Sequence, residues 1–160
     1  MNSISLEFHY GTRRSIVKAL EGLFPALRKF HDREYHGGYM NIAERSTGAP
    51  LLIMGVGNVP LERISRHLNF SIEKAMRLGA NPKHESSAQS RNSDKDQYSG
   101  AIRARDLIFS FSGFPEDLDE AAMLGIAVYV SQLLPAEAKR IAALSQNDKL
   151  LPVLNKFTRM

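Results

Sequence analysis

Alternation of apolar and polar residues marks the clearest strand of the chain. Between residues 107 and 112, Leu107, Phe109 and Phe111 alternate with Ile108 and two serines. A period of two is typical of a strand with one buried face. Phe109 and Phe111 should therefore share a face, and we expect at least one of them to lie in the core.

A helix is predicted directly after this strand and should end before Pro135. Pro115 suits the first helical position, where a missing N–H costs nothing. Four acidic residues between positions 116 and 120 favour the positive start of a helix. Apolar residues then recur at helical spacing, namely Leu118, Ala122, Ile126, Val130 and Leu133.

The same spacing predicts two earlier helices. The first covers residues 16–30 and contains Pro25, which removes a helix hydrogen bond, so we expect a kink or two helices in tandem. The second covers residues 61–76, opened by Pro60 and closed by Gly79.

Further strands are predicted at residues 39–44 and 50–56, joined by a connection that contains a glycine. Another short strand should precede the strand at 107–112. Residues 1–10 also alternate and predict a short strand or an ordered arm. With the helices, these strands predict an α+β fold, a profilin-like α/β/α sandwich in which a small antiparallel sheet is flanked by helices.

Two segments lie outside this pattern. Residues 81–99 predict a long loop that is either mobile or functional, and its part between His84 and Asp96 holds five charged residues and four serines, too polar to bury. A helical tail over residues 136–157, interrupted at Pro152, carries more apolar side chains than a free tail tolerates. We expect this tail to dock on its own domain or on a second subunit, and the chain to form one domain, 1–160.

Composition narrows the class of protein. The 160-residue chain has no cysteine, which excludes disulfides, a thiolate nucleophile and cysteine-based zinc sites. No apolar run is long enough for a signal peptide or a membrane span, so we expect no membrane partner and a cytoplasmic location. The net charge of +4 is mild. Because no helix carries a basic stripe and the arginines are not interleaved with aromatic residues, no nucleic acid is expected as a partner.

Four short motifs resemble the haem-binding or haem-degrading family typified by GlcG and HbpS, over roughly residues 12–134. In chain order they are Glu44 to Gly48 followed by Pro50-Leu51-Leu52, then Lys74-Ala75, then Gly100-Ala101-Ile102-Arg103, and last Ser112-Gly113 followed by Glu116, Asp119 and Glu120. The resemblance implies the same sandwich fold and points to haem as the cofactor to test.

The candidate ligand-binding residues are His67, Arg103 and Arg105. His67 lies beside an apolar helical stripe and could serve as an axial haem ligand, although a partly buried, hydrogen-bonded histidine explains the same position. Arg103 and Arg105 stand at alternate positions of one predicted strand. Their guanidinium groups would face one side and could hold the carboxylates of haem or of a small anionic ligand. A solvent-facing strand surface explains the same two arginines.

Other groupings of reactive side chains support no site. The segment His31 to His36 contains two imidazoles and two carboxylates, which suit zinc or nickel, but no second ligand pair accompanies it and a solvated helix end explains it. The serines near His84 and Asp94 match no nucleophile motif, so hydrolase chemistry is not expected. We therefore assign no catalytic residue and no metal ligand.

Two functions remain open at this point. The first is a non-enzymatic binding or assembly protein that forms a homo-oligomer, since a small sheet leaves an edge or face to be covered. The alternative is a small enzyme that acts on haem or on an acidic metabolite. The first is favoured because the sequence offers no nucleophile, no acid–base pair and no complete metal set.

Overall fold

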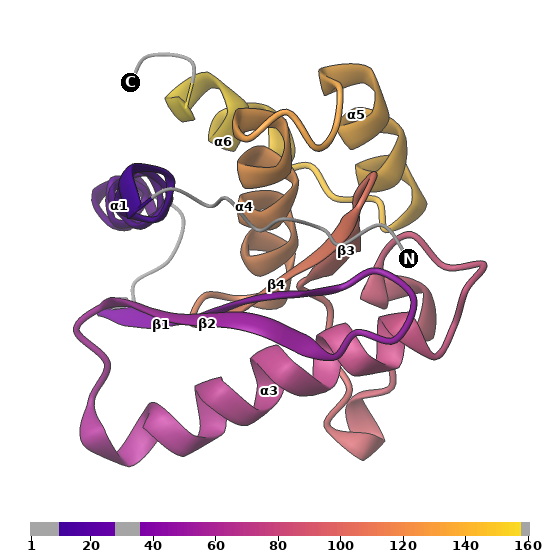
Figure 1. Cartoon of the computed structure of the whole chain (residues 1–160), viewed down its shortest axis with the longest axis horizontal. Helices are drawn as coiled ribbons and strands as arrows, with labels where there is room; N and C mark the ends of the chain where they lie inside the picture. The colour runs from indigo at the N-terminus through magenta and orange to yellow at the C-terminus, as the bar shows by residue number, and fades with distance from the viewer. Residues whose placement is uncertain (1–9, 28–35, 158–160) are drawn as a thin grey trace.

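The computed structural model of the protein describes residues 10–27 and 36–157 (Figure 1). The elements in chain order are α1 (Tyr10–Glu21), α2 (Phe24–Leu27), β1 (Gly37–Glu44), β2 (Pro50–Gly57), α3 (Leu61–Gly79), the short 3-10 helices η1 (Ser87–Ser90) and η2 (Ser93–Lys95), β3 (Ala101–Arg103), β4 (Leu107–Ser112), α4 (Glu116–Tyr129), α5 (Pro135–Leu144) and α6 (Leu150–Phe157). Of the strand or arm predicted at residues 1–10, residues 1–9 lie outside the described residues, and Tyr10 begins α1.

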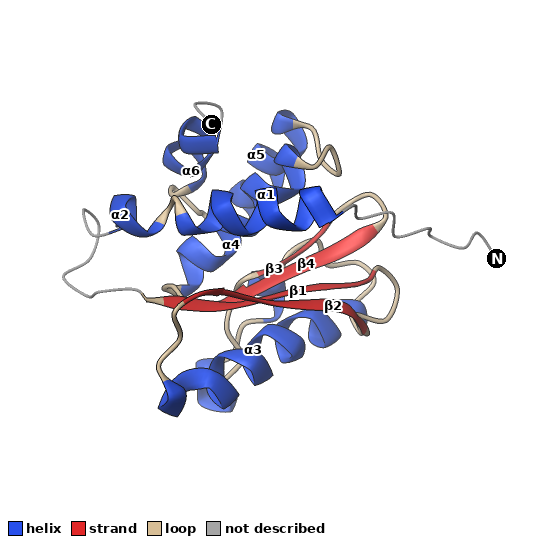
Figure 2. Ribbon diagram, turned by 60° about the vertical axis from the view of Figure 1, so that its left-hand side comes forward, coloured by secondary structure: helices blue, strands red, loops and turns tan. Residues whose placement is uncertain are grey.

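The four strands form one antiparallel sheet in the order β2-β1-β4-β3. Helices α1 and α4 lie on one face and α3 lies on the other, as Figures 1 and 2 show. The predicted α+β class, a small antiparallel sheet flanked by helices, is confirmed.

Most of the core lies between the sheet and the α1–α4 layer. Met40 and Ile42 of β1 and Phe109 and Phe111 of β4 point into it, and all four side chains are fully buried. Burial of both phenylalanines confirms the strand prediction. The layer beneath α3 is thinner, and its apolar cluster consists of Ala43, Ala75, Leu78, Ala101 and Ile108.

Pro25 and Pro152 both stand in the first turn of a helix, but the two predictions made from them differ in outcome. Pro25 follows the break between α1 and α2, so the tandem-helix prediction is confirmed. Pro152, by contrast, does not interrupt the tail, because it stands in the first turn of α6, where the N–H is not needed for a helix hydrogen bond. The prediction of an interruption at that residue was wrong.

The helical tail docks on its own domain. Helices α5 and α6 both pack against α4, and Val153, Leu154 and Phe157 of α6 are buried. A Cβ at Gly125 of α4 would overlap the Phe157 ring, so the small residue lets the two helices approach closely. Docking within the chain is therefore confirmed.

Helix α4 is the centre of this half of the molecule. Every residue from Leu118 to Ala127 is buried, because the sheet covers one side of α4 and α1, α5 and α6 cover the others. Across the described ranges, no helix combines the length and the hydrophobicity that a membrane crossing requires.

The loop before β3 is buried in part, contrary to the sequence-based expectation. Ser86 and Ser87 are fully buried. The Ser87 hydroxyl accepts a hydrogen bond from the Ala101 N–H at 3.0 Å, and the Ser86 hydroxyl donates to Glu120. Short polar side chains can be buried when their hydrogen bonds are satisfied. The count of polar residues therefore misled the prediction.

We predict that Phe111→Ala lowers the free energy of unfolding by about 3–5 kcal/mol, because the change leaves a cavity in a close-packed core. Urea unfolding measures the loss. Leu134→Ala is the matched control, since that side chain is 59 % exposed, and it should change stability by no more than about 0.5 kcal/mol. Equal effects of the two substitutions would contradict the assignment of β4.

Candidate functional site

A polar cleft of about 250 Å³ lies where the first turns of α4 meet the loop before β3 and the turn between α5 and α6. Its lining residues are Ala88, Arg91, Ser99, Glu116, Asp117, Glu120, Ser145, Gln146, Asn147 and Asp148. Four of these carry carboxylates and one carries a guanidinium group. We call this feature the acidic cleft, although the chain as a whole has a positive net charge.

Glu120 is the most enclosed acid of this cleft, with 1 % of its surface exposed. Its carboxylate accepts hydrogen bonds from the Ser86 hydroxyl, from the Ser145 hydroxyl at 2.6 Å and from Asn147 Nδ2 at 2.6 Å. All three donors are neutral, and no cationic side chain in the described part of the chain forms an ion pair with Glu120. A buried carboxylate without a cation is costly, so a positively charged group in the cleft would be favoured there.

Ser99 gives a second, independent sign of a ligand. Its residue is 5 % exposed, and its hydroxyl has no hydrogen-bond partner among the described residues. Leaving such a group unsatisfied costs about 1–3 kcal/mol. Ser99 also lines the cleft, so this unsatisfied hydroxyl lies beside the space that a ligand would occupy.

The rim of the cleft is held by Glu116. One carboxylate oxygen accepts a hydrogen bond from Arg91 Nε at 2.7 Å, and the other accepts from the Ser99 N–H at 2.9 Å. On the opposite side, Asn147 Nδ2 also donates to the Asp117 carbonyl at 2.7 Å. These bonds fix the loop before β3 and the α5–α6 turn to the same end of α4.

A buried ion pair lies behind the cleft. Lys74 Nζ of α3 is 2.8 Å from Asp119 Oδ2 of α4 and 2.9 Å from the Phe111 carbonyl oxygen. Asp119 Oδ1 accepts a hydrogen bond from the Phe114 N–H at 2.8 Å. Burial raises the pKa of Asp119 to about 6, although Lys74 and the backbone N–H groups oppose that rise. The pair joins helices on opposite faces of the sheet and positions the first turn of α4.

Gly100 allows this pair to form next to Ser99. Its φ is +129°, a conformation that favours glycine, and a Cβ at this residue would lie 2.8 Å from both Lys74 Nζ and Asp119 Cβ. The backbone of Gly100 therefore passes closely over the ion pair, and Ser99, the residue before it, lies in the wall of the cleft.

The predicted arginine pair does not form. Strand β3 ends at Arg103, so Arg105 lies beyond it and is exposed. Arg103 is 6 % exposed, and its guanidinium group donates to four backbone carbonyls, those of His84 at 3.0 Å, Leu78 at 2.6 Å, Asn81 at 3.2 Å and Arg45. Arg103 thus ties the β1–β2 turn and the end of α3 to β3. The binding of a ligand carboxylate by Arg103 stays a prediction. The four hydrogen bonds to backbone carbonyls disfavour it, because they already occupy the guanidinium group.

His67 lies on α3, apart from the acidic cleft. Its ring is half-buried, and Nδ1 is 3.1 Å from the Ser112 hydroxyl. Burial lowers the pKa of His67, with smaller contributions from nearby Arg63 and Lys74. The lowered pKa favours the neutral imidazole, which is the form that binds metals. The role of His67 as an axial haem ligand stays a prediction.

The described clefts do not suit a haem. Haem requires a large, mainly apolar slot beside its axial ligand, whereas the acidic cleft is small and polar. His67, Arg103 and Arg105 do not line this cleft, the groove between α5 and α6, or a third cleft between α1 and β2. We therefore assign no haem chemistry to the residues of the acidic cleft.

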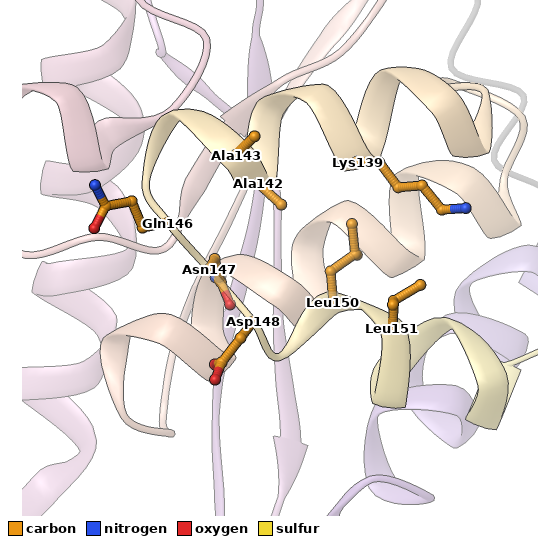
Figure 3. A pocket seen from close by; sticks show the side chains of 8 residues that line it. All are labelled: Lys139, Ala142, Ala143, Gln146, Asn147, Asp148, Leu150 and Leu151. Atoms are coloured by element: carbon orange, nitrogen blue, oxygen red, sulfur yellow. The ribbon is translucent and has the colours of Figure 1, made fainter.

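A larger groove of about 510 Å³ lies between α5 and α6 (Figure 3). It is lined by Lys139, Ala142, Ala143, Gln146, Asn147, Asp148, Leu150 and Leu151. The α5–α6 turn separates it from the acidic cleft and contributes residues to both. Because no buried, unpaired polar group lines this groove, we favour the smaller cleft as the functional site.

The histidine-rich segment lies outside the described residues except for His36. Within the described ranges, no group of three His, Cys, Asp or Glu side chains is arranged to hold a metal ion.

Sequence reasoning missed Glu120 and Ser99 as site residues. The acids at the start of α4 were interpreted together, through the helix dipole. A signal was nevertheless present, because Glu120 stands one turn after Glu116 and directly before the stretch from Ala121 to Tyr129, which contains no charged residue. An acid inside an apolar helical stretch needs a partner, or it marks a site.

We predict that Arg103→Met lowers the free energy of unfolding by at least about 2 kcal/mol, because buried carbonyls lose their donors. Arg105→Met is the matched control and should change it by no more than about 0.5 kcal/mol. Chemical unfolding of both variants measures the difference. A small effect of Arg103→Met would mean that its carbonyl contacts contribute little and would favour a ligand-binding role.

We predict a pH dependence that arises from Asp119. Its pKa rises from 3.8 to about 6 on folding, so the folded protein binds this proton more tightly than the unfolded chain does. The free energy of unfolding should therefore fall as pH rises from about 4 to about 6. This component should be absent from Asp119→Asn and present in the exposed control Asp94→Asn. Identical pH profiles for wild type and Asp119→Asn would contradict the raised pKa.

Comparison of the chain with protein-family models, with curated proteins and with solved structures found no match. The resemblance to the GlcG and HbpS family therefore rests on the quoted motifs alone.

Proposed function

We propose that this protein is a non-enzymatic binding protein that holds a small, positively charged molecule in the acidic cleft at the start of α4. The observation that carries the proposal is the buried Glu120 carboxylate, whose donors are all neutral, beside the unpartnered hydroxyl of Ser99. An ammonium group would offset the charge of Glu120, and a second polar group would satisfy Ser99.

The size and charge of the cleft support this class of ligand. A volume of about 250 Å³ lies below the range of about 300–1,000 Å³ that is usual for drug-sized ligands, so a small amine fits better than a large cofactor. Arg91 and Lys149 pair with two of the four carboxylates, Glu116 and Asp148. The other two, Asp117 and Glu120, form no ion pair within the described residues, which disfavours the anionic ligand that the sequence suggested.

Binding without turnover is supported by the surroundings of Ser99. A serine nucleophile needs a base that is hydrogen-bonded to its hydroxyl. In the described part of the chain no base contacts Ser99 Oγ. The proposal also includes a homo-oligomer and, on the sequence argument given above, a cytoplasmic location.

The test is a titration of the purified protein with a panel of small primary amines, each paired with a carboxylate of the same carbon skeleton. We predict that one or more amines raise the Tm and that the matched carboxylates do not, because only the amines compensate Glu120. Mass spectrometry of the recovered amine should show it unchanged.

Variants localise the effect. Glu120→Gln removes the charge but keeps the shape, and Ser99→Ala removes the unpartnered hydroxyl, so both should weaken amine binding. Ser93→Ala is the matched control, since Ser93 is exposed in the same loop, and it should bind like wild type. Stabilisation by the carboxylates alone, or equal binding by Glu120→Gln and wild type, would refute the proposal. A chemically altered amine would instead support the enzymatic alternative.

A further inference from the structure

Strand β2 forms an edge of the sheet, and part of its backbone points away from the other strands. It pairs with β1 alone. The Asn58 N–H donates to the His36 carbonyl at 2.7 Å, and hydrogen-bonded positions alternate along an antiparallel pair. Every second residue of β2 therefore bonds to β1, whereas Ile53 and Gly55 direct their N–H and C=O groups outward. Within the described ranges these outward groups have no hydrogen-bond partner.

The free edge of β2 lacks the usual protection against pairing with another strand. Edge strands that stay unpaired commonly carry charges, prolines or bulges. Strand β2 contains no charged residue, and its only proline is Pro50, the first residue. Its register irregularity lies at that same end, before residue 52. Residues 52–57 can therefore accept a further strand.

A cleft of about 420 Å³ follows this free edge between α1 and β2. It contacts three consecutive residues of β2, namely Ile53, Met54 and Gly55. Since neighbouring side chains of a strand point to opposite faces, a cleft that touches all three runs along the backbone edge. Figure 2 shows α1 lying over one face of the sheet.

The α1 side of the cleft is positively charged. Arg13, Arg14 and Lys18 line it and are exposed, whereas Glu21 is the one acid among its lining residues. No ion pair between described residues involves any of these three cations. The cleft thus combines free backbone donors and acceptors with an excess of positive charge.

We propose that the free edge of β2 binds an extended, acidic segment of a partner protein, which adds a fifth strand to the sheet. The backbone of the segment bonds to the outward N–H and C=O groups of Ile53 and Gly55. Its side chains on the α1 face meet the three cations, which favours Asp or Glu there. Its side chains on the other face lie beside Ile53, which is 37 % exposed. The partner segment therefore alternates acidic and apolar residues.

Charge favours an acidic partner over a second copy of this chain at this edge. Antiparallel pairing of two β2 strands continues one sheet through both copies and leaves both α1 helices on the same face. The cations of the two α1 helices would then gather on one side of the join, where like charges repel. An acidic strand offsets the same cations.

The test uses the full-length protein and a fluorescent peptide of about eight residues in which glutamate alternates with valine. One matched peptide replaces each glutamate by lysine, and a second keeps the composition but groups the glutamates at one end. Fluorescence anisotropy measures binding. We expect the alternating acidic peptide to bind and added salt to weaken it. The two matched peptides should bind at least about tenfold more weakly.

Substitutions at Gly55 test the backbone contact. Gly55→Pro removes the outward N–H, and an edge strand tolerates proline where the N–H is not used within the sheet. Gly55→Ala is the matched control, since it keeps the N–H and its Cβ makes an ordinary contact, 3.7 Å from the Tyr39 ring. We expect peptide binding at least about tenfold weaker for Gly55→Pro and unchanged for Gly55→Ala. Circular dichroism shows whether both variants are folded.

Reversal of charge on α1 gives a second set of variants, which does not alter the sheet. Arg14→Glu combined with Lys18→Glu should weaken binding of the acidic peptide at least about tenfold. Arg105→Glu reverses an exposed charge beyond β3 and should leave binding unchanged. Equal binding by the α1 variant and by Arg105→Glu would refute the charge assignment and with it the proposal.

Amide hydrogen exchange locates the added strand. The N–H groups of Ile53 and Gly55 should exchange quickly in the free protein and slowly with the peptide bound. Slow exchange before peptide is added would show that the edge is already covered, by the chain itself or by a second copy, and would overturn the proposal. Unchanged exchange on binding, or equal binding by Gly55→Pro and Gly55→Ala, would do the same. These outcomes do not bear on the amine titration, which concerns the acidic cleft.

Discussion

The ion pair between Lys74 and Asp119 is the contact on which the arrangement of the site depends. It connects α3, on one face of the sheet, with the first turn of α4 on the other, at the end of β4. Desolvation of the two charges makes this contact expensive, as the raised pKa of Asp119 indicates. The ion pair matters for the fold because it fixes the position of the start of α4. Asp119 also binds the Phe114 N–H, so the start of α4 is fixed relative to β4 and to α3 together.

The acidic cleft follows from that fixed start. Glu120 is the next residue along α4, and its carboxylate is held by donors from the loop before β3 and from the α5–α6 region. Glu116, one turn earlier, fixes Ser99 and Arg91. The first two turns of α4 thus carry three acids with different contacts: Asp119 joins the two helical layers, Glu120 joins the loops, and Glu116 forms the rim of the cleft. Binding a cation in this cleft would require no new fold element, only occupation of space that these contacts already define.

The sequence predicted the parts of the fold that depend on local patterns. The alternation around Phe109 and Phe111, the break near Pro25 and the α3 boundaries at Pro60 and Gly79 all follow from periodicity and from backbone restrictions. The site could not be predicted in this way, because Ser86, Ser99 and Glu120 meet only after the layers have packed. Arg103 shows the same limit, since its four carbonyl partners come from three separate segments. Long-range partners decide whether a polar side chain is structural or available to a ligand.

The close approach of Gly125 to Phe157 has a consequence for how the chain folds during its synthesis. Helix α4 packs against α1 near the beginning of the chain and against α6 near the end of the described residues. Contacts between residues so distant in sequence form slowly, because a long loop must close first. During synthesis, the side of α4 that packs against α6 therefore stays exposed to solvent until residue 157 has left the ribosome. Over that interval the exposed apolar surface can cause the nascent chain to aggregate.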